Sequence, residues 1–240
     1  MKSIWYNYCM DNTVGRLQSC FSQDQIDLII GSLLGDARLE CRSIGIRHPI
    51  SARLRIHQSD KQKEYVFWKY SLLKDFVVSP PRKVMAWHDP QRNKDHYSWY
   101  FHTKTLEELG ELHSWFYQDK IKVFPEGIFD VFTSRMLAIW FMDDGANTDQ
   151  SFTLSTHCFS KEEQGRIVKL LKERFDISAT IVKDRTKLKI GIGRKEYKKF
   201  IQIVEPFVIP SMNYKIAYPR NDFSDRDRRE LERVKLPLFS

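Results

Sequence analysis

The chain has 240 residues, and its 39 Lys and Arg against 31 Asp and Glu give a formal net charge of +8. This length allows one large domain or two small ones, and a hydrophobic content of 42% is typical of a folded globular protein rather than a disordered one. No run approaches the ~18 apolar residues of a membrane helix, and residues 1–22 lack the apolar core of a secretory signal. The four cysteines (Cys9, Cys20, Cys41 and Cys158) form no C-x-x-C pair, which argues against a zinc knuckle and favours a reducing compartment. We therefore expect an intracellular protein, not bound to a membrane, whose first partner to consider is a polyanion.

The first recognisable element is an apolar segment that ends in a carboxylate. Residues 26–36 read Ile-Asp-Leu-Ile-Ile-Gly-Ser-Leu-Leu-Gly-Asp. Ser22 precedes this segment at the position of a helix N-cap, where a hydroxyl accepts a hydrogen bond from the first turn. The pattern predicts a helix that ends at Asp36.

Strict alternation follows this helix. In residues 52–58 the apolar side chains fall on one face, and Arg53, Arg55 and His57 fall on the other. A period of two residues indicates a strand with one buried face. Helical patterns over 61–76 and 106–116, with weaker alternation over 97–102, complete the first half of the chain.

The second half repeats this order. Residues 136–145 (Met-Leu-Ala-Ile-Trp-Phe-Met-Asp-Asp-Gly) form another apolar segment, with Thr133 or Ser134 at the N-cap position. Its terminal Asp144 lies 144 − 36 = 108 residues after Asp36. Alternation over 151–156 and 187–192 and helical patterns over 160–175 and 195–204 follow.

These repeats predict an α+β protein made of two pseudo-symmetric half-domains, each ordered αββαββα. We expect an N-terminal extension at 1–21, half-domains at 22–125 and 126–222, and a charged tail at 223–240.

An aspartate at the C-terminal end of a helix is electrostatically unfavourable, because that end already carries about half a negative charge. One interpretation is that Asp36 and Asp144 are solvated turn residues, since Asp-Gly commonly ends a helix. However, each ends the most apolar helix of its half, so both carboxylates are expected near the centre of the molecule. Such carboxylates need a partner, and a divalent cation is a natural one.

Gly31 and Gly35, four residues apart, leave one stripe of the first helix without side chains. This stripe allows another helix to approach closely. Two such helices packed together would bring Asp36 and Asp144 side by side, an arrangement that fits two-metal hydrolysis of a phosphodiester.

At these residues the chain resembles a known family. The segments Ile29-Ile-Gly-Ser-Leu-Leu-Gly-Asp-Ala37 and Leu137-Ala-Ile-Trp-Phe-Met-Asp-Asp-Gly145 are similar to the two motifs of a monomeric LAGLIDADG homing endonuclease, in particular of the yeast mitochondrial omega-intron type. Three further stretches carry the resemblance over residues 22–220: Ser79-Pro-Pro-Arg-Lys83, Lys122-Val-Phe-Pro125 and Pro210-Ser-Met-Asn-Tyr-Lys215. The motifs depart from the family pattern at Ser32, Ala37, Ile139 and Trp140.

The resemblance implies that the motif helices pack at the interface of the halves and that Asp36 and Asp144 are metal-binding catalytic residues. The carbonyls of Gly35 and Asp143 would be secondary metal ligands, and a metal role for the Asp143 side chain stays open. Lys122 and Lys215 resemble the basic residues beside each site, with Lys120 a rival to Lys122. The implied cofactor is Mg²⁺, as two or three ions, with Mn²⁺ able to substitute and Ca²⁺ binding without cleavage.

The resemblance also gives the alternating strands a role, as two antiparallel sheets that form a DNA-binding saddle. A two-stranded ribbon fits the major groove, where Arg reads guanine and Lys contacts guanine or phosphate. A strand of seven residues spans about seven base pairs at ~3.3 Å per residue, so two different halves indicate a long, non-palindromic site. The candidate DNA contacts are Arg38, Arg42, Arg53, Arg55, His57 and Lys83 in the first half and Ser151, Thr153, Ser155, Lys187 and Lys189 in the second.

The sequence leaves three functions open. The first is a monomeric, site-specific double-strand DNA endonuclease that cuts one phosphodiester per strand, leaves short 3′ overhangs and promotes intron mobility. The second is an RNA maturase that binds its host intron RNA, and the third is a catalytically silent DNA-binding regulator. Both motif aspartates are present, which argues against the third. A mitochondrion, a plastid and a bacterial cytoplasm all suit the cysteine content.

Overall fold

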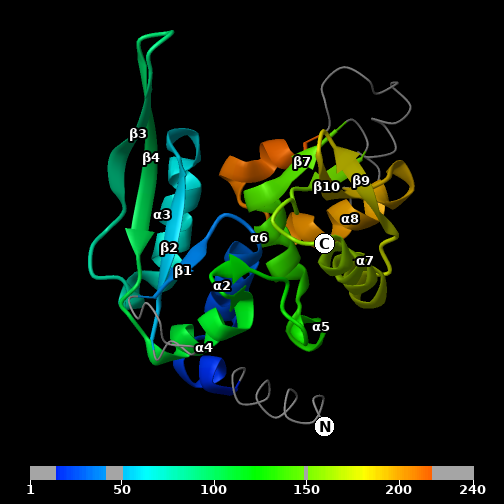
Figure 1. The fold of residues 1–240 in the computed structure, drawn as a ribbon, viewed down its shortest axis with the longest axis horizontal. Helices are drawn as coiled ribbons and strands as arrows, with labels where there is room; N and C mark the ends of the chain where they lie inside the picture. Colours follow the sequence, from blue (N-terminus) through cyan, green and yellow to red (C-terminus); the bar gives the residue numbers. More distant parts are fainter. Residues whose placement is uncertain (1–14, 42–50, 149–150, 218–240) are drawn as a thin grey trace, which may run out of the picture.

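The computed structural model describes residues 15–41, 51–148 and 151–217. Figure 1 shows two mixed halves side by side, with helices α2 and α6 between their sheets. Within the described residues, no helix is long and apolar enough to cross a membrane. Arg42 and the tail at 223–240 lie outside these residues, as does most of the predicted N-terminal extension, of which residues 15–20 are helical.

The first half follows the predicted order. A helix, two strands, a helix, two strands and a helix succeed one another as α2 (Gln23–Leu34), β1 (Arg38–Glu40), β2 (Arg53–Ser59), α3 (Lys63–Leu73), β3 (Arg82–Asp89), β4 (Lys94–His102) and α4 (Glu107–Phe116). The strands form an antiparallel sheet in the order β1-β2-β4-β3. Single 3-10 turns flank α3 on both sides, which accounts for the longer helical pattern predicted over 61–76.

The second half repeats this topology. Its elements are α6 (Ser134–Asp144), β7 (Gly145–Asn147), β8 (Phe152–Leu154), α7 (Lys161–Phe175), β9 (Ala179–Asp184), β10 (Lys187–Ile192) and α8 (Tyr197–Val204). Its sheet has the equivalent order β7-β8-β10-β9. The prediction of an α+β protein with two antiparallel sheets and repeated halves is therefore confirmed.

The two halves are joined by a small hairpin and a short helix. They are β5 (Tyr117–Gln118), β6 (Ile121–Lys122) and α5 (Ile128–Val131). The predicted division at 125/126 falls between β6 and α5, and it stays a prediction.

Local signals in the sequence start the motif helices. The Ser22 side chain accepts a hydrogen bond from the Gln25 amide while the Gln25 side chain accepts one from the Ser22 amide, which completes a capping box. Thr133, rather than Ser134, caps α6 by accepting a hydrogen bond from the Met136 amide. Both helices therefore begin where the sequence predicts.

The core is continuous across both halves. Helix α6 is buried on nearly all sides, from Met136 to Met142, and α2 is buried from Ile26 to Leu34. Helix α3 packs against β2 and β4, and α7 packs against β9 and β10, so each sheet has one face covered by helices. Because the two motif helices are central, their C-terminal ends carry the site.

Candidate active site and nucleic-acid face

Helices α2 and α6 approach each other closely because glycines lie at their contact. A Cβ atom at Gly31 would lie 2.8 Å from the Met136 carbonyl oxygen and 2.9 Å from Ile139 Cβ. A Cβ atom at Gly35 would lie 2.5 Å from Asp143 Cβ. Neither position therefore tolerates a side chain without separation of the helices. The expected role of this glycine stripe is confirmed.

The two helices deliver Asp36 and Asp144 to one region. Helix α2 ends at Leu34 and Asp36 follows its C-cap Gly35, whereas Asp144 is the last residue of α6. Asp36 is exposed and Asp144 is half-buried, so both can meet a ligand from solvent.

Burial and the neighbouring carboxylates shift the pKa values of Asp36 and Asp144. Burial, followed by the charges of Asp36 and Asp143, raises the pKa of Asp144 to about 7. Partial desolvation of the carboxylate by the surrounding protein, followed by the charge of Asp143, also raises the pKa of Asp36. The proximity expected of the two carboxylates is therefore reflected in their electrostatics, and the pair favours binding of a cation.

A lysine binds the carbonyl group that precedes each of these aspartates. Lys122 Nζ donates a hydrogen bond of 2.8 Å to the Gly35 oxygen, and Lys215 Nζ donates one of 2.9 Å to the Asp143 oxygen. Both lysines are half-buried, and burial lowers the pKa of each, partly offset by nearby anionic groups. The lysines also satisfy carbonyl groups at the helix C-termini. The two carbonyls predicted as secondary metal ligands thus accept lysine hydrogen bonds here.

The geometry separates Lys122 from its rival. Lys120 lies in the turn of the β5–β6 hairpin with positive φ and is exposed, whereas Lys122 on β6 reaches both Gly35 and Ala37 carbonyl oxygens. Lys122 is therefore the lysine that the fold brings to the site.

The side chain of Asp143 has a different environment from that of Asp144. It is fully buried, and Lys69 Nζ donates to its two oxygens at 2.7 and 3.0 Å. Gln58 Nε2 donates to Asp143 Oδ1 at 2.6 Å and lies 3.4 Å from Asp36 Oδ2. The Asp143 carboxylate is thus held within a buried ion pair, which leaves its backbone carbonyl as the group that could serve a metal.

Gln58 and Lys69 were not expected at the site from the sequence, although a signal was present for each. Gln58 falls at the next position of the buried face after Leu54 and Ile56, so it breaks the apolar pattern. Lys69 lies on α3 four residues after buried Tyr65 and four before buried Leu73. A polar side chain at a core position requires a buried partner. Gln58 and Lys69 share one such partner, the carboxylate of Asp143, which precedes Asp144.

The donor set fits a divalent cation bound largely by oxygen. Asp36 and Asp144 provide two carboxylates, and the buried Gln58 Oε1 has no hydrogen-bond donor among the described residues. Mg²⁺ is commonly bound by one or two carboxylates together with water and substrate phosphate. Among the described residues, no group of three or more His, Cys, Asp or Glu side chains is arranged to hold a metal ion.

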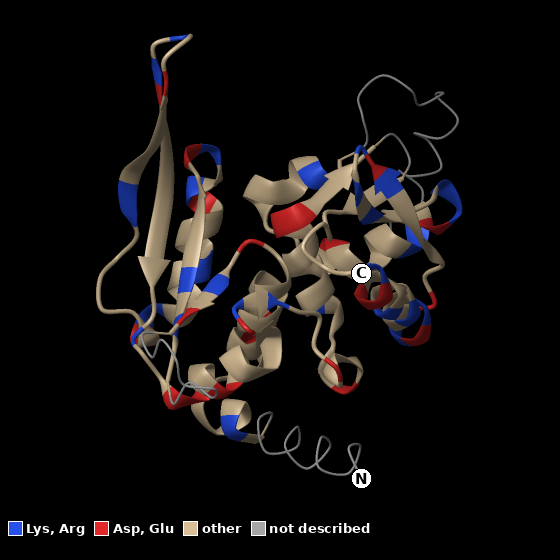
Figure 2. Ribbon diagram, viewed as in Figure 1, with Lys and Arg blue, Asp and Glu red and all other residues tan. Residues whose placement is uncertain are grey.

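Basic residues occur along β1 and β2 of the first sheet, where Figure 2 colours them blue. Leu54 and Ile56 are buried, whereas Arg53, Arg55 and His57 lie on the opposite face and are partly exposed. The facing predicted from alternation is confirmed. We call this surface, with Arg38 on β1, the arginine face.

Lys83 lies on the other side of this sheet from the arginine face. It pairs in register with Trp99, which pairs with buried Gln58. Its ammonium group lies 3.0 Å from Asp60 Oδ2 and over the Tyr97 ring. The prediction that Lys83 joins the other DNA contacts conflicts with this placement, because neighbouring strand residues alternate between faces.

The second sheet has a less basic outer face. Thr153 and Lys189 lie on the side away from buried Leu154 and Ile190, and Lys187 is exposed. The Ser155 amide donates to the Asp144 carbonyl, which places Ser155 beside the site, whereas Ser151 bonds to Thr148 in a turn. Thr153, Lys187 and Lys189 therefore share the outer face of this sheet, whereas Ser151 lies in the turn before β8 and Ser155 lies beside the site.

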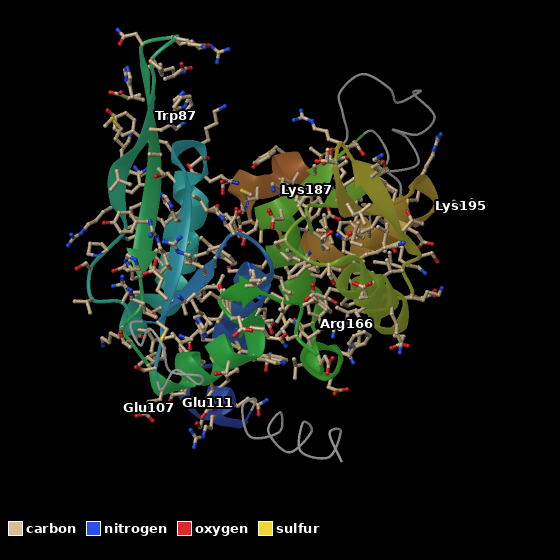
Figure 3. The ribbon with its side chains drawn as sticks, viewed as in Figure 1. Trp87, Glu107, Glu111, Arg166, Lys187 and Lys195 are labelled. Atoms are coloured by element: carbon tan, nitrogen blue, oxygen red, sulfur yellow. The ribbon has the colours of Figure 1, made fainter. Side chains whose placement is uncertain are left out.

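Exposed aromatic rings also occur on the first sheet. Trp87 on β3 is 53% exposed and stacks on His96 of β4 with ring centroids 4.7 Å apart. Figure 3 labels Trp87 on the outer part of the β3–β4 hairpin. Trp115 and Phe116, in contrast, are buried.

Comparison with known proteins identifies the family of this chain. Residues 26–200, which include both motif helices and both sheets, match the model of the LAGLIDADG DNA endonuclease family. The chain belongs to this family. Membership of this family implies DNA endonuclease activity.

LAGLIDADG relatives include both endonucleases and a maturase. The chain is 31% identical to the DNA endonuclease I-ChuI of Chlamydomonas applanata, over 82% of this chain and 95% of that protein. It is 27% identical to the cytochrome b mRNA maturase bI2 of Saccharomyces cerevisiae, over 87% of this chain and 50% of that protein. The homing endonuclease I-WcaI, solved bound to its DNA recognition sequence, superposes with a TM-score of 0.74 at 25% identity, covering 83% of this chain and 88% of that one.

Proposed function

We propose that this LAGLIDADG protein is a site-specific homing endonuclease that hydrolyses one phosphodiester on each strand of a long, asymmetric DNA target. The observation that carries this proposal is the convergence of Asp36 and Asp144 at the ends of two packed helices, each next to a carbonyl group held by a lysine. The similarity to I-ChuI along nearly the whole of both chains supports the same activity.

In the proposed site, Asp36 and Asp144 hold two or three Mg²⁺ ions, with the carbonyls of Gly35 and Asp143 as secondary ligands. The chemistry that divalent ions supply when bound is neutralisation and polarisation at the scissile phosphate. Lys122 and Lys215 are placed to donate to negative charge that develops on the phosphate or to order the attacking water. Mn²⁺ is expected to substitute for Mg²⁺, and Ca²⁺ to support binding without cleavage.

In the proposed complex, the outer faces of the two sheets form a saddle on the DNA. The arginine face of the first sheet differs from the threonine and lysine face of the second, which favours a non-palindromic target bound by a monomer. Cuts across the minor groove would leave short 3′ overhangs and promote intron mobility. The site of action is proposed to be intracellular, in an organelle or a bacterial cytoplasm.

The test has two steps. Selection from a randomised duplex library in Ca²⁺ identifies a bound sequence, and that duplex is then incubated with Mg²⁺, Mn²⁺ or EDTA. We expect double-strand cleavage that is lost in Asp36→Asn and Asp144→Asn. Asp130→Asn, which neutralises an exposed aspartate on α5, is the matched control and should cleave like the wild type. Full Mg²⁺-dependent cleavage by the Asp36→Asn/Asp144→Asn double variant would refute the assignment.

A second candidate function is RNA maturation, favoured by the similarity to the yeast mRNA maturase. This role would use the basic surface on host intron RNA and would not require the two aspartates. Splicing of the host intron in a strain that carries Asp36→Asn/Asp144→Asn distinguishes the two functions. Splicing that persists while cleavage is lost would show that the chain has both.

A further inference from the structure

An acidic residue lies at the centre of the arginine face. Strand β1 pairs with β2 so that Glu40 is opposite Arg53 and Arg38 is opposite Arg55. Leu39 between them points to the core and is buried. Residues opposite each other in an antiparallel pair share a face, so Glu40 lies among three arginines on the surface proposed to meet DNA.

The contacts of Glu40 use both of its carboxylate oxygens. Oε1 accepts from Arg38 Nε at 3.0 Å and Nη2 at 2.8 Å, and from Arg55 Nη1 at 3.3 Å. Oε2 accepts from Arg53 Nε at 3.0 Å and Nη2 at 2.8 Å, and lies 3.5 Å from His102 Nε2. The carboxylate is only 23% exposed. It therefore has little capacity left to contact a base itself.

These contacts fix the planes of two guanidinium groups. Arg38 and Arg53 each bind through the edge formed by Nε and Nη2, which leaves the Nη1 edge of each free to donate. An arginine bound in this way has fewer accessible rotamers than a free one, and a planar fork in a fixed orientation is the group that reads guanine in the major groove. Single surface ion pairs contribute little, but here one carboxylate accepts from three guanidinium groups, and Arg38 and Arg53 each donate two N–H groups to one of its oxygens, so the contacts form a network.

Without Glu40, the same three arginines would be free to contact any phosphate group. Such contacts raise affinity for all sequences alike and make binding more dependent on salt. The carboxylate also reduces the charge of the cluster by one. Its burial raises the pKa of Glu40, but the hydrogen bonds from Arg53, Arg38 and Arg55 outweigh this and lower it to about 2, so the group is ionised at neutral pH.

We propose that Glu40 is a positioning residue that determines DNA specificity: it holds Arg38 and Arg53 for base contacts in the first half of the target and prevents Arg38, Arg53 and Arg55 from binding phosphates indiscriminately. This inference rests on the proposed DNA-binding function. It concerns selection of the target and assigns Glu40 no part in hydrolysis.

Two variants separate orientation from charge. Glu40→Gln removes the charge at constant shape, and Glu40→Asp keeps the charge but shortens the side chain so that it cannot reach both forks. The matched control is Asp176→Asn at the C-terminal end of α7, because Asp176 also pairs with two basic side chains, Lys172 and Lys199, on the helical side of the second half. Circular dichroism is used to check that each variant is folded.

The first measurement is binding to a 40-base-pair duplex of random sequence over a series of salt concentrations. For Glu40→Gln we expect a plot of log affinity against log salt that is steeper by about one to two, and affinity at low salt about 3- to 10-fold higher, because each added phosphate contact changes the slope by about 0.9. Glu40→Asp and Asp176→Asn should keep the wild-type slope.

The second measurement is selection from a randomised duplex library in Ca²⁺. Both Glu40 variants should lose preference for guanine in one half of the selected sequence and keep the other half, whereas Asp176→Asn should select the wild-type sequence. Wild-type selection by both Glu40 variants would overturn the inference, as would an even loss over both halves. If the wild type itself selects no sequence, both proposals fail. If it selects one but cleaves without Asp36 and Asp144, only the proposed catalytic site fails.

Discussion

The buried ion pair between Lys69 and Asp143 provides the sharpest test of the site's architecture. Both side chains are 0% exposed, and the ammonium group lies 4.4 Å from the centroid of the Tyr65 ring. Gln58 donates to the same carboxylate, and the Tyr65 hydroxyl group also lies beside it. We predict that Lys69→Met strongly destabilises the metal-free protein, because Asp143 would remain as a buried charge with only neutral donors.

The expected loss is about 3–5 kcal/mol in the free energy of unfolding, the range observed when one partner of a buried pair is removed. This is a large part of the 5–15 kcal/mol that stabilises a typical domain. Asp143→Asn should cost a similar amount, since it leaves the ammonium group buried. The double variant Lys69→Met/Asp143→Asn removes both charges, and we expect it to lose only about 1–2 kcal/mol relative to the wild type, because only neutral hydrogen bonds are lost.

The assay is urea unfolding in EDTA, followed by far-ultraviolet circular dichroism and tryptophan fluorescence. Lys169→Met is the matched control, since Lys169 forms an exposed pair with Glu173 on α7 and should lose less than about 0.5 kcal/mol. The reasoning is refuted if Lys69→Met loses less than about 1 kcal/mol, or if the two single losses simply add in the double variant.

Three further predictions concern stability. Gly31→Val should lower the melting temperature and cost about 1–3 kcal/mol or more in the free energy of unfolding, because the valine side chain would overlap Ile139. Gly165→Ala, at an open position in α7, should raise the melting temperature instead. In EDTA at pH 8, Asp144→Asn should be more stable than the wild type by at most about 4 kcal/mol, because a carboxyl pKa raised from 3.8 to about 7 costs the wild type stability above pH 4. The thermal unfolding curves of the two proteins should therefore converge near pH 4. A variant less stable than the wild type would contradict this prediction. For Glu40 the pH effect has the opposite sign, because a pKa lowered from 4.5 to about 2 stabilises the fold above pH 4.5. The loss of unfolding free energy in Glu40→Gln, measured by urea unfolding, should therefore shrink as the pH falls towards 2. A loss that grows at low pH would contradict the assigned ion pairs.

The elements that the sequence predicted well are those with a buried face. Strand β2 alternates strictly because one side packs on α3, and the predicted strand at 187–192 matches β10 at both ends. Strand β3 had no such signal. Most of its residues are exposed, since the β3–β4 hairpin extends beyond the core, so no apolar face is required and no alternation arises.

The candidate site could be proposed from the sequence where it depends on the ends of helices, but not where it depends on contacts between distant residues. Asp36 and Asp144 became candidates because each follows or ends an apolar helix, and their catalytic role stays a prediction. The partners of Asp143 are 74 and 85 residues away in sequence, and no local pattern pairs them. Glu40 was overlooked for a different reason: it occupies the same alternating face as Arg38, but a single acid among basic residues adds little to a charge pattern.

The contact between Gly35 and Asp143 limits how the two halves can be recombined. Only one side chain fits between the helix ends at this point, and it is supplied by the second half. Two copies of the second half packed in the same way would place aspartate against aspartate, whereas two copies of the first would place glycine against glycine. Chimaeras with related nucleases should therefore exchange Gly35, Asp143 and Lys69 together. The two helix ends are sterically complementary, and this complementarity determines which halves can pack together before any DNA is bound.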